Sequence, residues 1–386
     1  MNSTPPRVGI LLHDLRGGGA EGVMLKLARG LLDRGYAVDI LLVRSGGVLT
    51  ALIPEQAAVF ELNGARVATA IPKLARYLRD RRPDWLISAL THVNLAAILA
   101  CRVSGTGVRL IVTEHTQISR RARATANLSG RLTYALTPIL YRLADRIVAV
   151  SDGAAEDLRA FARLPADRVQ RIYNPVFDEG LLTASRADVD HPWMAGRHRV
   201  ILAAGRLEPV KGFDVLLRAF ARLRQTEVCK LIILGEGQQR PALEALTAEL
   251  GVAADVALPG FSASPYAFMS RADVFVVSSH FEGLSVALIE ALACGSSVVS
   301  TDCPSGPSEI LDGGKFGALV PVGDPDAMAD AIRTALAGPR GRHAHRAEAF
   351  SITEAVEAYI DLMEGPSHHA GALPGSTAAR TLTNQR

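Results

Sequence analysis

The sequence contains few cysteines and no long apolar run, and both absences narrow the class of protein. Its 386 residues include four cysteines, with no C-x-x-C pair and no histidines at zinc-ligand spacing. A disulfide framework and a structural zinc site are therefore not expected. No stretch approaches the roughly 18 apolar residues of a membrane-spanning helix, and the N-terminus lacks the charged and apolar regions of a signal peptide. We expect a cytoplasmic protein in a reducing compartment.

The small net charge of +3 conceals two halves of opposite sign. Residues 1–176 contain 24 lysines and arginines against 14 aspartates and glutamates, a balance of +10, whereas residues 177–386 balance at −7. A basic half suits an anionic surface or substrate, since each cation near acidic lipid adds roughly 1 kcal/mol of attraction. Two ordinary domains with unequal solvated faces would give the same balance.

Short apolar runs alternate with longer amphipathic stretches, first up to residue 150 and again after residue 199. The runs predict strands at 8–12, 38–43, 85–88, 109–113, 146–150, 200–204, 231–234, 274–278 and 297–301. The stretches predict helices at 20–34, 73–81, 128–143, 213–224, 240–250, 284–294 and 325–336, the last with Asp324 as its N-cap. This alternation is typical of α/β domains whose parallel sheets are covered on both faces.

The interruption at Tyr173-Asn174-Pro175 divides the chain into two such domains. We expect a first domain at 1–176, a second domain at 177–350, a helix at 351–364 that packs back toward the first domain, and a disordered tail at 365–386. Ligands of doubly wound sheets lie beyond the carboxyl ends of the strands. Two facing sheets therefore predict a cleft that holds the chemistry.

A glycine run follows the first predicted strand. Gly17, Gly18 and Gly19 precede a helix, where glycine lets the backbone approach a ligand and free amides attract anions. The run lacks the third glycine of the dinucleotide fingerprint, which argues against a Rossmann oxidoreductase. A tight turn between strand and helix would explain the glycines equally well.

Two cations lie on the loop after the strand at 200–204. Arg206 can form forked hydrogen bonds to a diphosphate, and Lys211 can add a point charge. Such a pair would stabilise the charge on a leaving nucleoside diphosphate without a divalent ion. Two solvated surface cations are the plainer alternative.

Two glutamates eight positions apart follow the strand at 274–278. A helix expected from about Gly283 places Glu282 at its mouth and Glu290 about 12 Å further along its axis. This separation suits opposite ends of an elongated ligand, such as the sugar and the ribose of a nucleotide sugar. It exceeds the roughly 5 Å between the carboxyls of a retaining hydrolase.

Together these stretches resemble the retaining glycosyltransferases of family 4, which have the GT-B fold. The matching stretches, in the family's order, are 17–21, Glu114-His115-Thr116, Val150-Ser151-Asp152, Tyr173-Asn174-Pro175, Gly205-Arg206-Leu207 with Lys211-Gly212, Gly235-Glu236-Gly237, Leu258-Pro259-Gly260 and the E-x7-E pair Glu282 and Glu290. They cover the chain from about residue 8 to about 320.

The resemblance implies a role for each matching residue. Arg206 and Lys211 would bind the donor diphosphate, Glu290 the ribose hydroxyls, and Glu282 and His115 the transferred sugar. A hydrogen-bonded core histidine is the plainer alternative for His115. The other implied donor ligands are the backbone groups of Gly18, Gly19, Gly283, Leu284 and Ser285. No cofactor and no metal is expected, because the D-x-D triplets at 188–190 and 324–326 lie in a polar connection and at a helix start.

The resemblance implies that the first domain, 1–176, binds the acceptor and the second domain, 177–350, binds the nucleotide sugar, but its motifs define the acceptor site less closely. Residues 116–146 combine six arginines with interspersed apolar residues, a pattern suited to anionic lipid or a lipid-diphosphate acceptor. A core helix whose cations reach water would give the same pattern. The loop at 301–311 resembles that of bacterial surface-polysaccharide transferases and favours a UDP-linked donor, with a GDP-linked one still open.

We therefore expect transfer of a hexose or N-acetylhexosamine from a nucleoside-diphosphate sugar to a lipid-linked or glycan acceptor in surface polysaccharide biosynthesis. The setting would be the cytoplasm or the inner face of the cell membrane, with no nucleic-acid partner. Two alternatives remain. One is a sugar-nucleotide epimerase of the same fold, and the other is a non-catalytic subunit that binds a nucleotide sugar.

Overall fold

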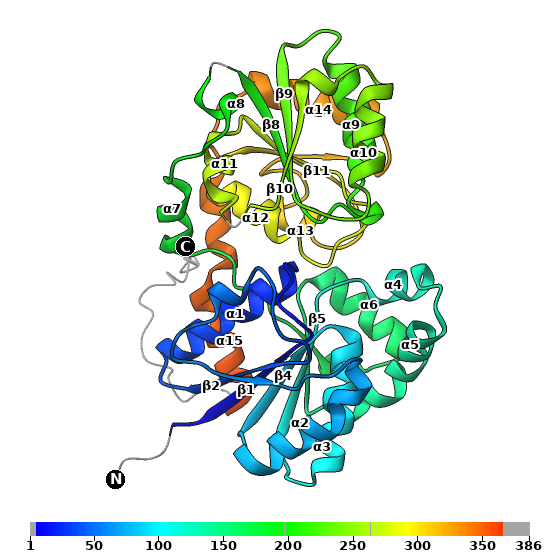
Figure 1. Cartoon of the computed structure of the whole chain (residues 1–386), viewed down its shortest axis with the longest axis vertical. Helices are drawn as coiled ribbons and strands as arrows, with labels where there is room; N and C mark the ends of the chain where they lie inside the picture. The colour runs from blue at the N-terminus through cyan, green and yellow to red at the C-terminus, as the bar shows by residue number, and fades with distance from the viewer. Residues whose placement is uncertain (1–4, 197, 263, 366–386) are drawn as a thin grey trace, which may run out of the picture.

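The chain folds into two α/β domains that lie one above the other along the longest axis of the molecule (Figure 1). The computed structural model describes residues 5–196, 198–262 and 264–365. All neighbouring strands in both sheets run parallel. Each domain has two apolar clusters of buried side chains, as expected when helices cover both faces of a sheet. The predicted pair of doubly wound domains is confirmed.

The first domain is built on a seven-stranded sheet. Its strands, in spatial order, are β3 (Ala58–Glu61), β2 (Ala37–Leu42), β1 (Arg7–Leu12), β4 (Trp85–Ala89), β5 (Arg109–Glu114), β6 (Arg146–Ala149) and β7 (Val169–Arg171). Its helices are α1 (Gly19–Asp33), α2 (Val67–Arg81), α3 (Thr91–Ser104), α4 (Ile118–Ala124), α5 (Leu128–Leu140) and α6 (Asp152–Ala162). The inner strands are buried along almost their whole length, which explains their continuous apolar runs.

The second domain is built on a six-stranded sheet. Its strands, in spatial order, are β10 (Val256–Gly260), β9 (Cys229–Leu234), β8 (Arg199–Ala204), β11 (Val274–Val277), β12 (Ser297–Thr301) and β13 (Ala318–Val320). Its helices are α7 (Glu179–Ser185), α8 (Pro192–Ala195), α9 (Phe213–Leu223), α10 (Arg240–Glu249), α11 (Tyr266–Arg271), α12 (Val286–Ala293), α13 (Pro307–Ile310) and α14 (Pro325–Ala337). Asp324 caps α14 as predicted, accepting hydrogen bonds from the amides of Asp326 and Ala327.

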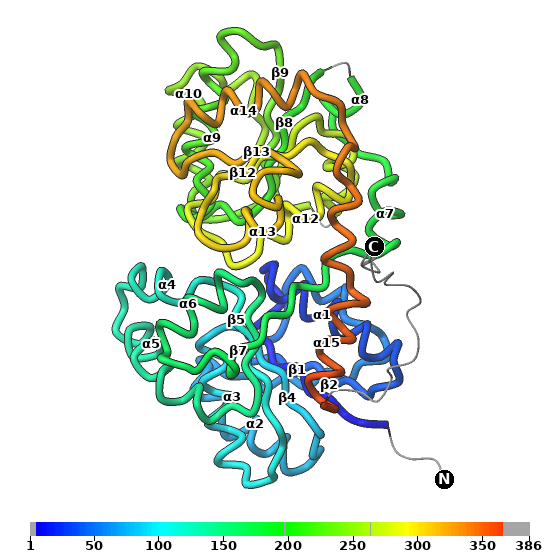
Figure 2. The backbone as a smooth tube through the Cα atoms, turned by 180° about the vertical axis from the view of Figure 1, so that it is seen from behind, coloured from blue at the N-terminus to red at the C-terminus, as the bar shows by residue number. Residues whose placement is uncertain are grey.

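The chain crosses between the domains twice, and the two crossings lie side by side. The amides of Val176 and Phe177 both donate to the carbonyl of Phe350, at 3.1 and 3.0 Å. After the second crossing, helix α15 (Ile352–Glu364) runs down the first domain beside α1 (Figure 2). Its apolar face joins the core cluster under β1 and β2. The last helix thus belongs to the first domain in space.

The strands that the sequence pattern missed share a physical cause, and the longest missed helix has a different one. Four missed strands, β3, β7, β10 and β13, are the edges of the two sheets, where a strand needs no long apolar run. Helix α3 was missed because it is buried on almost every side and shows little helical periodicity. Among the helices of the described residues, none combines the length and the apolar character needed to cross a membrane.

Candidate active site

The strand orders of the two sheets indicate where a ligand site is expected. The order reverses between β1 and β4 in the first sheet and between β8 and β11 in the second. Loops leaving the strands diverge at such a switch point and open a crevice for ligands. The loops from the two sheets meet: a Cβ atom on Gly283, after β11, would overlap the carbonyl oxygen of His115, after β5. Only glycine permits this approach between the domains.

Lys211 and Glu282 form an enclosed charged pair at this junction. The Lys211 ammonium donates to Oε1 of Glu282 at 2.7 Å, and the Ser279 hydroxyl donates to the same oxygen at 2.6 Å. The two charged side chains are 26% and 13% exposed. Lys211 ends a short 3-10 helix, and a Cβ atom on the following Gly212 would overlap the carbonyl of Ser278. The backbone therefore fixes the lysine against the loop that carries Glu282.

Arg206 lies on the same loop as Lys211 but is not part of that pair. Its side chain is 55% exposed, and its guanidinium forms an ion pair with Glu208 at 3.1 Å. It also faces the first domain: burial raises the pKa of Glu21 on α1, and Arg206 is among the groups that oppose this shift. Arg206 therefore stands at the mouth of the junction, opposite the start of α1.

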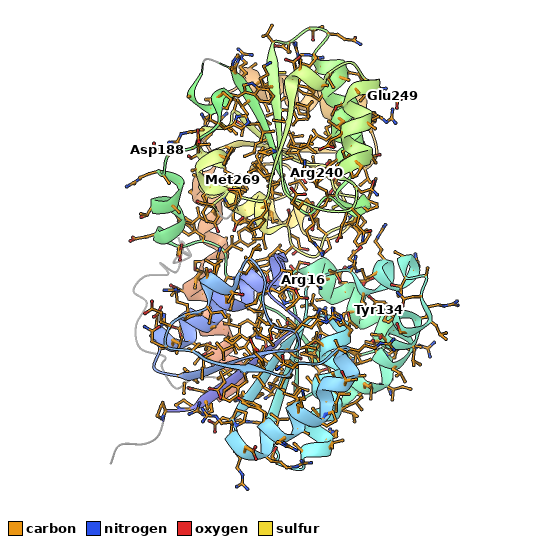
Figure 3. All side chains as sticks on the ribbon, viewed as in Figure 1. Arg16, Tyr134, Asp188, Arg240, Glu249 and Met269 are labelled. Carbon is orange, nitrogen blue, oxygen red and sulfur yellow. The ribbon has the colours of Figure 1, made fainter. Side chains whose placement is uncertain are left out.

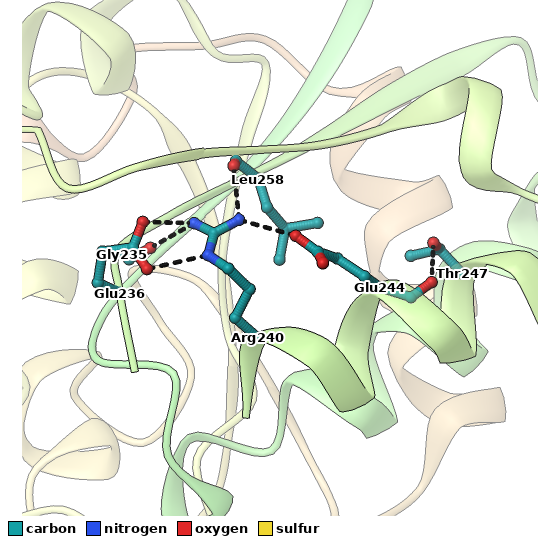
Figure 4. Close-up of polar contacts among 6 residues, drawn as sticks. All are labelled: Gly235, Glu236, Arg240, Glu244, Thr247 and Leu258. Carbon is teal, nitrogen blue, oxygen red and sulfur yellow. Dashed lines mark hydrogen bonds and ion pairs between the residues drawn. The ribbon is translucent and has the colours of Figure 1, made fainter. Parts of the chain in front are cut away.

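Arg240 holds the loop at 235–237 (Figure 4). This loop lies beside the Arg206 loop, because the amide of Leu207 donates to the carbonyl of Glu236. The Arg240 guanidinium forms a forked pair of hydrogen bonds to the Glu236 carboxylate at 2.9 and 2.6 Å. The same side chain donates to Glu244 and to the carbonyls of Gly235 and Leu258. This network shapes the matched Gly235-Glu236-Gly237 stretch, whose glycines pack against the backbone of the Arg206 loop.

The structure corrects the predicted start of the helix that carries Glu290. Helix α12 begins at Val286 rather than at Gly283. The carbonyl of Gly283 accepts hydrogen bonds from the hydroxyls of Ser151 (2.7 Å) and Ser305 (2.8 Å) instead of entering a helical ladder. Gly283, Leu284 and Ser285 thus form a buried connection at the junction, and Glu282 precedes the helix by four residues.

Glu290 is buried in α12, with partners different from those of Glu282. The Tyr266 hydroxyl donates to its Oε1 at 3.1 Å, and the Lys26 ammonium from α1 lies 3.5 Å from the same oxygen. Burial raises the pKa of Glu290, while Lys26 and Tyr266 lower it. The two glutamates of the E-x7-E pair are therefore held separately, each beside a lysine.

Gly18 and Gly19 bring the start of α1 to the junction. Gly18 is the N-cap residue, and the carboxylate of Glu21 folds over the space where a side chain would be. Gly19 faces Val286 at the start of α12, with 4.0 Å between that side chain and the place of a Cβ atom. Free amides at this helix start suit an anion.

His115 carries a buried ring nitrogen that lacks a partner among the described residues. The Thr113 hydroxyl donates to the carbonyl of Ser88 at 2.9 Å, so it must accept from Nε2–H of His115, also at 2.9 Å. Nδ1 is then a bare acceptor, and no described group bonds to it. Burial lowers the pKa of His115 to about 4. A neutral, unpaired acceptor of this kind is ready for a ligand hydroxyl.

Sequence reasoning missed polar residues after β1 and β4, which flank the switch point of the first sheet. The rings of His13 and His92 lie 5.1 Å apart, and Asp14 holds Arg16 by a forked contact at 2.9 and 2.7 Å. Figure 3 places Arg16 at the border with the second domain. Their position directly after β1 and β4 was the signal that could have identified them.

A second missed contact fastens the domains at α6. The carboxylate of Glu309 accepts from the amides of Asp152 and Gly153 at 2.8 and 2.9 Å. These amides open α6 and have no partner within that helix, so Glu309 from the second domain supplies one. The resemblance matched 150–152 but could not identify the partner of these amides.

The D-x-D triplets lie away from the junction. Asp324 is engaged as the cap of α14, and Figure 3 places Asp188 on the outer edge of the second domain. Across the described ranges, no group of three His, Cys, Asp or Glu side chains is placed to hold a metal ion.

Comparison with solved structures identifies the fold. The structure of Anabaena HepE in complex with UDP and glucose superimposes with a TM-score of 0.78 at 20% identity, covering 93% of this chain and 99% of that one. The fold is therefore GT-B, the two-domain architecture of glycosyltransferases.

The chain belongs to glycosyltransferase family 4. The family profile described as Glycosyltransferase Family 4 matches residues 17–179, and the profile described as Glycosyl transferases group 1 matches residues 193–351. An N-acetylgalactosamine-N,N'-diacetylbacillosaminyl-diphospho-undecaprenol 4-alpha-N-acetylgalactosaminyltransferase of Campylobacter jejuni is 31% identical over 361 residues, 91% of this chain and 96% of the relative. A lipopolysaccharide core biosynthesis glycosyltransferase of Rhizobium meliloti, LpsE, is 33% identical over 58% of this chain and 65% of its own length. The protein is therefore a glycosyltransferase, and it is similar to enzymes of glycan biosynthesis.

Proposed function

We propose that this glycosyltransferase moves a hexose or N-acetylhexosamine from a nucleoside-diphosphate sugar to a lipid-linked or glycan acceptor, with retention of configuration and without a metal ion. The observation that carries the proposal is the Lys211–Glu282 pair, which lies at the switch point of the second sheet. The bond between the anomeric carbon and the diphosphate oxygen would break while the acceptor oxygen bonds to that carbon. The acceptor proton would leave with the departing diphosphate.

Each matched residue has a role in this proposal. Lys211 and Arg206 would neutralise the leaving diphosphate, where a preorganised cation can supply about 10²- to 10³-fold in rate. Glu282 would hold a sugar hydroxyl, and Nδ1 of His115 would accept a hydrogen bond from another. Glu290 would bind the ribose. The remaining donor contacts would come from the backbone of Gly18, Gly19, Gly283, Leu284 and Ser285.

The relatives support a UDP-linked donor and a lipid-diphosphate acceptor. The Anabaena structure contains UDP and glucose, and the Campylobacter relative is named for an acceptor joined through a diphosphate to undecaprenol. A GDP-linked donor is the alternative to test, because a mannosyltransferase named as GDP-mannose-dependent is also 34% identical over 40% of this chain.

An exposed surface on the first domain supports a location at the inner face of the cell membrane. We define the α4–α5 surface as the exposed arginines and the apolar side chains of these helices: Arg120, Arg121, Arg123, Arg131, Leu128, Leu132, Leu136 and Ile139. The apolar members recur every three or four positions along α5, and Leu128 is 83% exposed. None of the four arginines forms an ion pair with a described residue. Cations beside an apolar stripe suit anionic lipid.

Incubation with radiolabelled UDP- and GDP-sugars and a bacterial lipid extract tests the proposal. Label in the lipid fraction, lost in Lys211→Ala, is the expected result. Tight nucleotide binding without product from any donor would instead indicate a binding subunit. An altered sugar on the recovered nucleotide would indicate an epimerase.

A further inference from the structure

Lys26 contacts both the connection between the domains and the second domain itself. It projects from α1 in the first domain, and its ammonium donates to the carbonyl of Val176, in the first crossing between the domains, at 3.0 Å. The same nitrogen lies 3.5 Å from Oε1 of Glu290 in the second domain. It also lies 5.9 Å from the centre of the Tyr266 ring. The Lys26 ammonium therefore links α1 to the connection between the domains and to the carboxylate of Glu290.

We propose that Lys26 is a positioning residue that sets the angle between the domains and, in that closed arrangement, prepares Glu290 to receive the donor nucleotide. The second clause rests on the proposed function, because it takes Glu290 as the ribose ligand. The first clause depends only on the contacts of the ligand-free protein.

The geometry of Glu290 supports this coupling. Both Lys26 and Tyr266 approach Oε1, and no described residue donates to Oε2. Oε2 therefore remains for a ribose hydroxyl, which binds an ionised carboxylate more strongly than a neutral one. Opening of the domains would withdraw Lys26 and leave a buried carboxyl with Tyr266 alone, a state in which protonation is favoured.

Among the described residues, few titratable groups face Glu290. Lys26 comes from α1 and Tyr266 from α11, while the Cys294 thiol lies at the C-cap of α12, one turn after Glu290, with a pKa raised to about 12 by burial and by Glu290 itself. Lys26 is the only cation among them. Its removal would raise the pKa of Glu290 further and shift the acid limit of nucleotide binding to higher pH.

Lys26 differs from the other contacts between the domains. Glu309 of the second domain accepts from the backbone amides that open α6. The Ser151 hydroxyl of the first domain donates to the backbone carbonyl of Gly283. Lys26 instead contacts a side chain of the E-x7-E pair, Glu290, and also the carbonyl of Val176 in the connection between the domains. Loss of Lys26 is therefore expected to change both the domain angle and the donor site.

Small-angle X-ray scattering of the ligand-free protein tests the first clause. Lys26→Met is expected to increase the radius of gyration, because it removes the ammonium but keeps a long apolar stem. Lys26→Arg should restore the wild-type value, since it retains the charge. Lys73→Met on α2 is the matched control, because the Lys73 ammonium donates to the carbonyl of Asn63, in its own domain. Glu290→Gln removes the same ion pair from the other side and should reproduce the change if Lys26→Met is unstable.

Calorimetric titration with UDP and with GDP tests the second clause. Lys26→Met is expected to bind the nucleotide about fivefold to tenfold more weakly at neutral pH, with a larger loss at pH 6 than at pH 8. A merely structural lysine would not give this pH dependence. Affinity that is the same as wild type at every pH would overturn this clause.

The outcomes separate the inference from the proposed function. Scattering curves of Lys26→Met and Glu290→Gln that superimpose on the wild type would overturn the role of Lys26 in domain placement. If the curves change as expected while the wild type binds neither nucleotide, the nucleotide-sugar donor fails and the positioning role stands.

Discussion

The second-domain side of the junction and the α4–α5 surface of the first domain differ in how their positive charges are paired. At the junction, Lys211 pairs with Glu282 and Arg206 with Glu208. On the α4–α5 surface of the first domain, the arginines have no such partner among the described residues, and apolar side chains stand exposed between them. Paired charges hold one geometry for a small ligand. Unpaired charges on an apolar stripe suit an extended anionic surface without fixed geometry.

Removal of the paired lysine is the strongest way to break this contrast. Lys211→Ala is expected to reduce kcat about 10²- to 10³-fold, because a fixed cation at the leaving diphosphate is lost. Steady-state transfer assays measure this effect. Lys230→Ala is the matched control, since Lys230 forms an ion pair with Asp255 at the opposite end of the same sheet. Equal kcat values for the two variants would remove Lys211 from the mechanism.

Removal of the unpaired arginines tests the other half. Arg120, Arg121 and Arg123, all changed to Gln, are expected to reduce partition onto vesicles containing anionic lipid roughly 100-fold, since each cation adds roughly 1 kcal/mol near such a surface. Co-sedimentation with phosphatidylglycerol vesicles measures the effect, and phosphatidylcholine vesicles should show no difference.

A charge-matched variant of the same domain controls this experiment. Arg76, Arg79 and Arg82 lie exposed on or beside α2, where no apolar stripe accompanies them. Their change to Gln alters the net charge equally and should leave binding largely intact. An equal loss in both triple variants would mean that net charge, and not the α4–α5 surface, attracts the protein.

Removal of Glu290 sharpens the donor side of the comparison. Glu290→Ala is expected to weaken nucleotide binding by about 1.5 to 3 kcal/mol, because a buried charged hydrogen bond is lost. Isothermal titration with UDP measures this loss. Glu249→Ala, on the outer edge of the second domain (Figure 3), should leave the affinity unchanged. An unaltered affinity in Glu290→Ala would contradict its role at the ribose.

The smallest expected effect concerns His115 and pH. Burial lowers its pKa from 6.5 to about 4, so between these values the unfolded chain binds a proton that the folded protein does not. Stability is therefore lost as pH falls through this window, by about 2 kcal/mol at pH 5. His115→Gln should lack this loss when thermal unfolding is compared at pH 7.5 and pH 5. Glu114, whose pKa burial raises to about 7, is present in both proteins and cancels. The same pH dependence in both proteins would show that His115 is not held neutral.

The inner strands and the matched loops could be predicted from the sequence because local rules determine them. A strand covered on both faces must be apolar along its length, and a loop at its carboxyl end shows its chemistry in consecutive residues. Edge strands carry a weaker pattern, and α3 carries none, since it is buried on nearly all sides.

Contacts between the domains could not be predicted in this way. Lys26 and Glu290 are 264 positions apart, and their meeting depends on the angle at which two independent sheets face each other. Glu309 reaches α6 for the same reason. The start of α12 was misplaced because hydroxyls from two distant segments take the Gly283 carbonyl out of the helix.

A crystal structure of the protein with bound UDP tests the central claim most directly. We predict that diphosphate oxygens lie within hydrogen-bond distance of the Lys211 ammonium and the Arg206 guanidinium, with a ribose hydroxyl on Oε2 of Glu290. UDP bound outside the junction, or bound there without contact to Lys211 and Glu290, would contradict it.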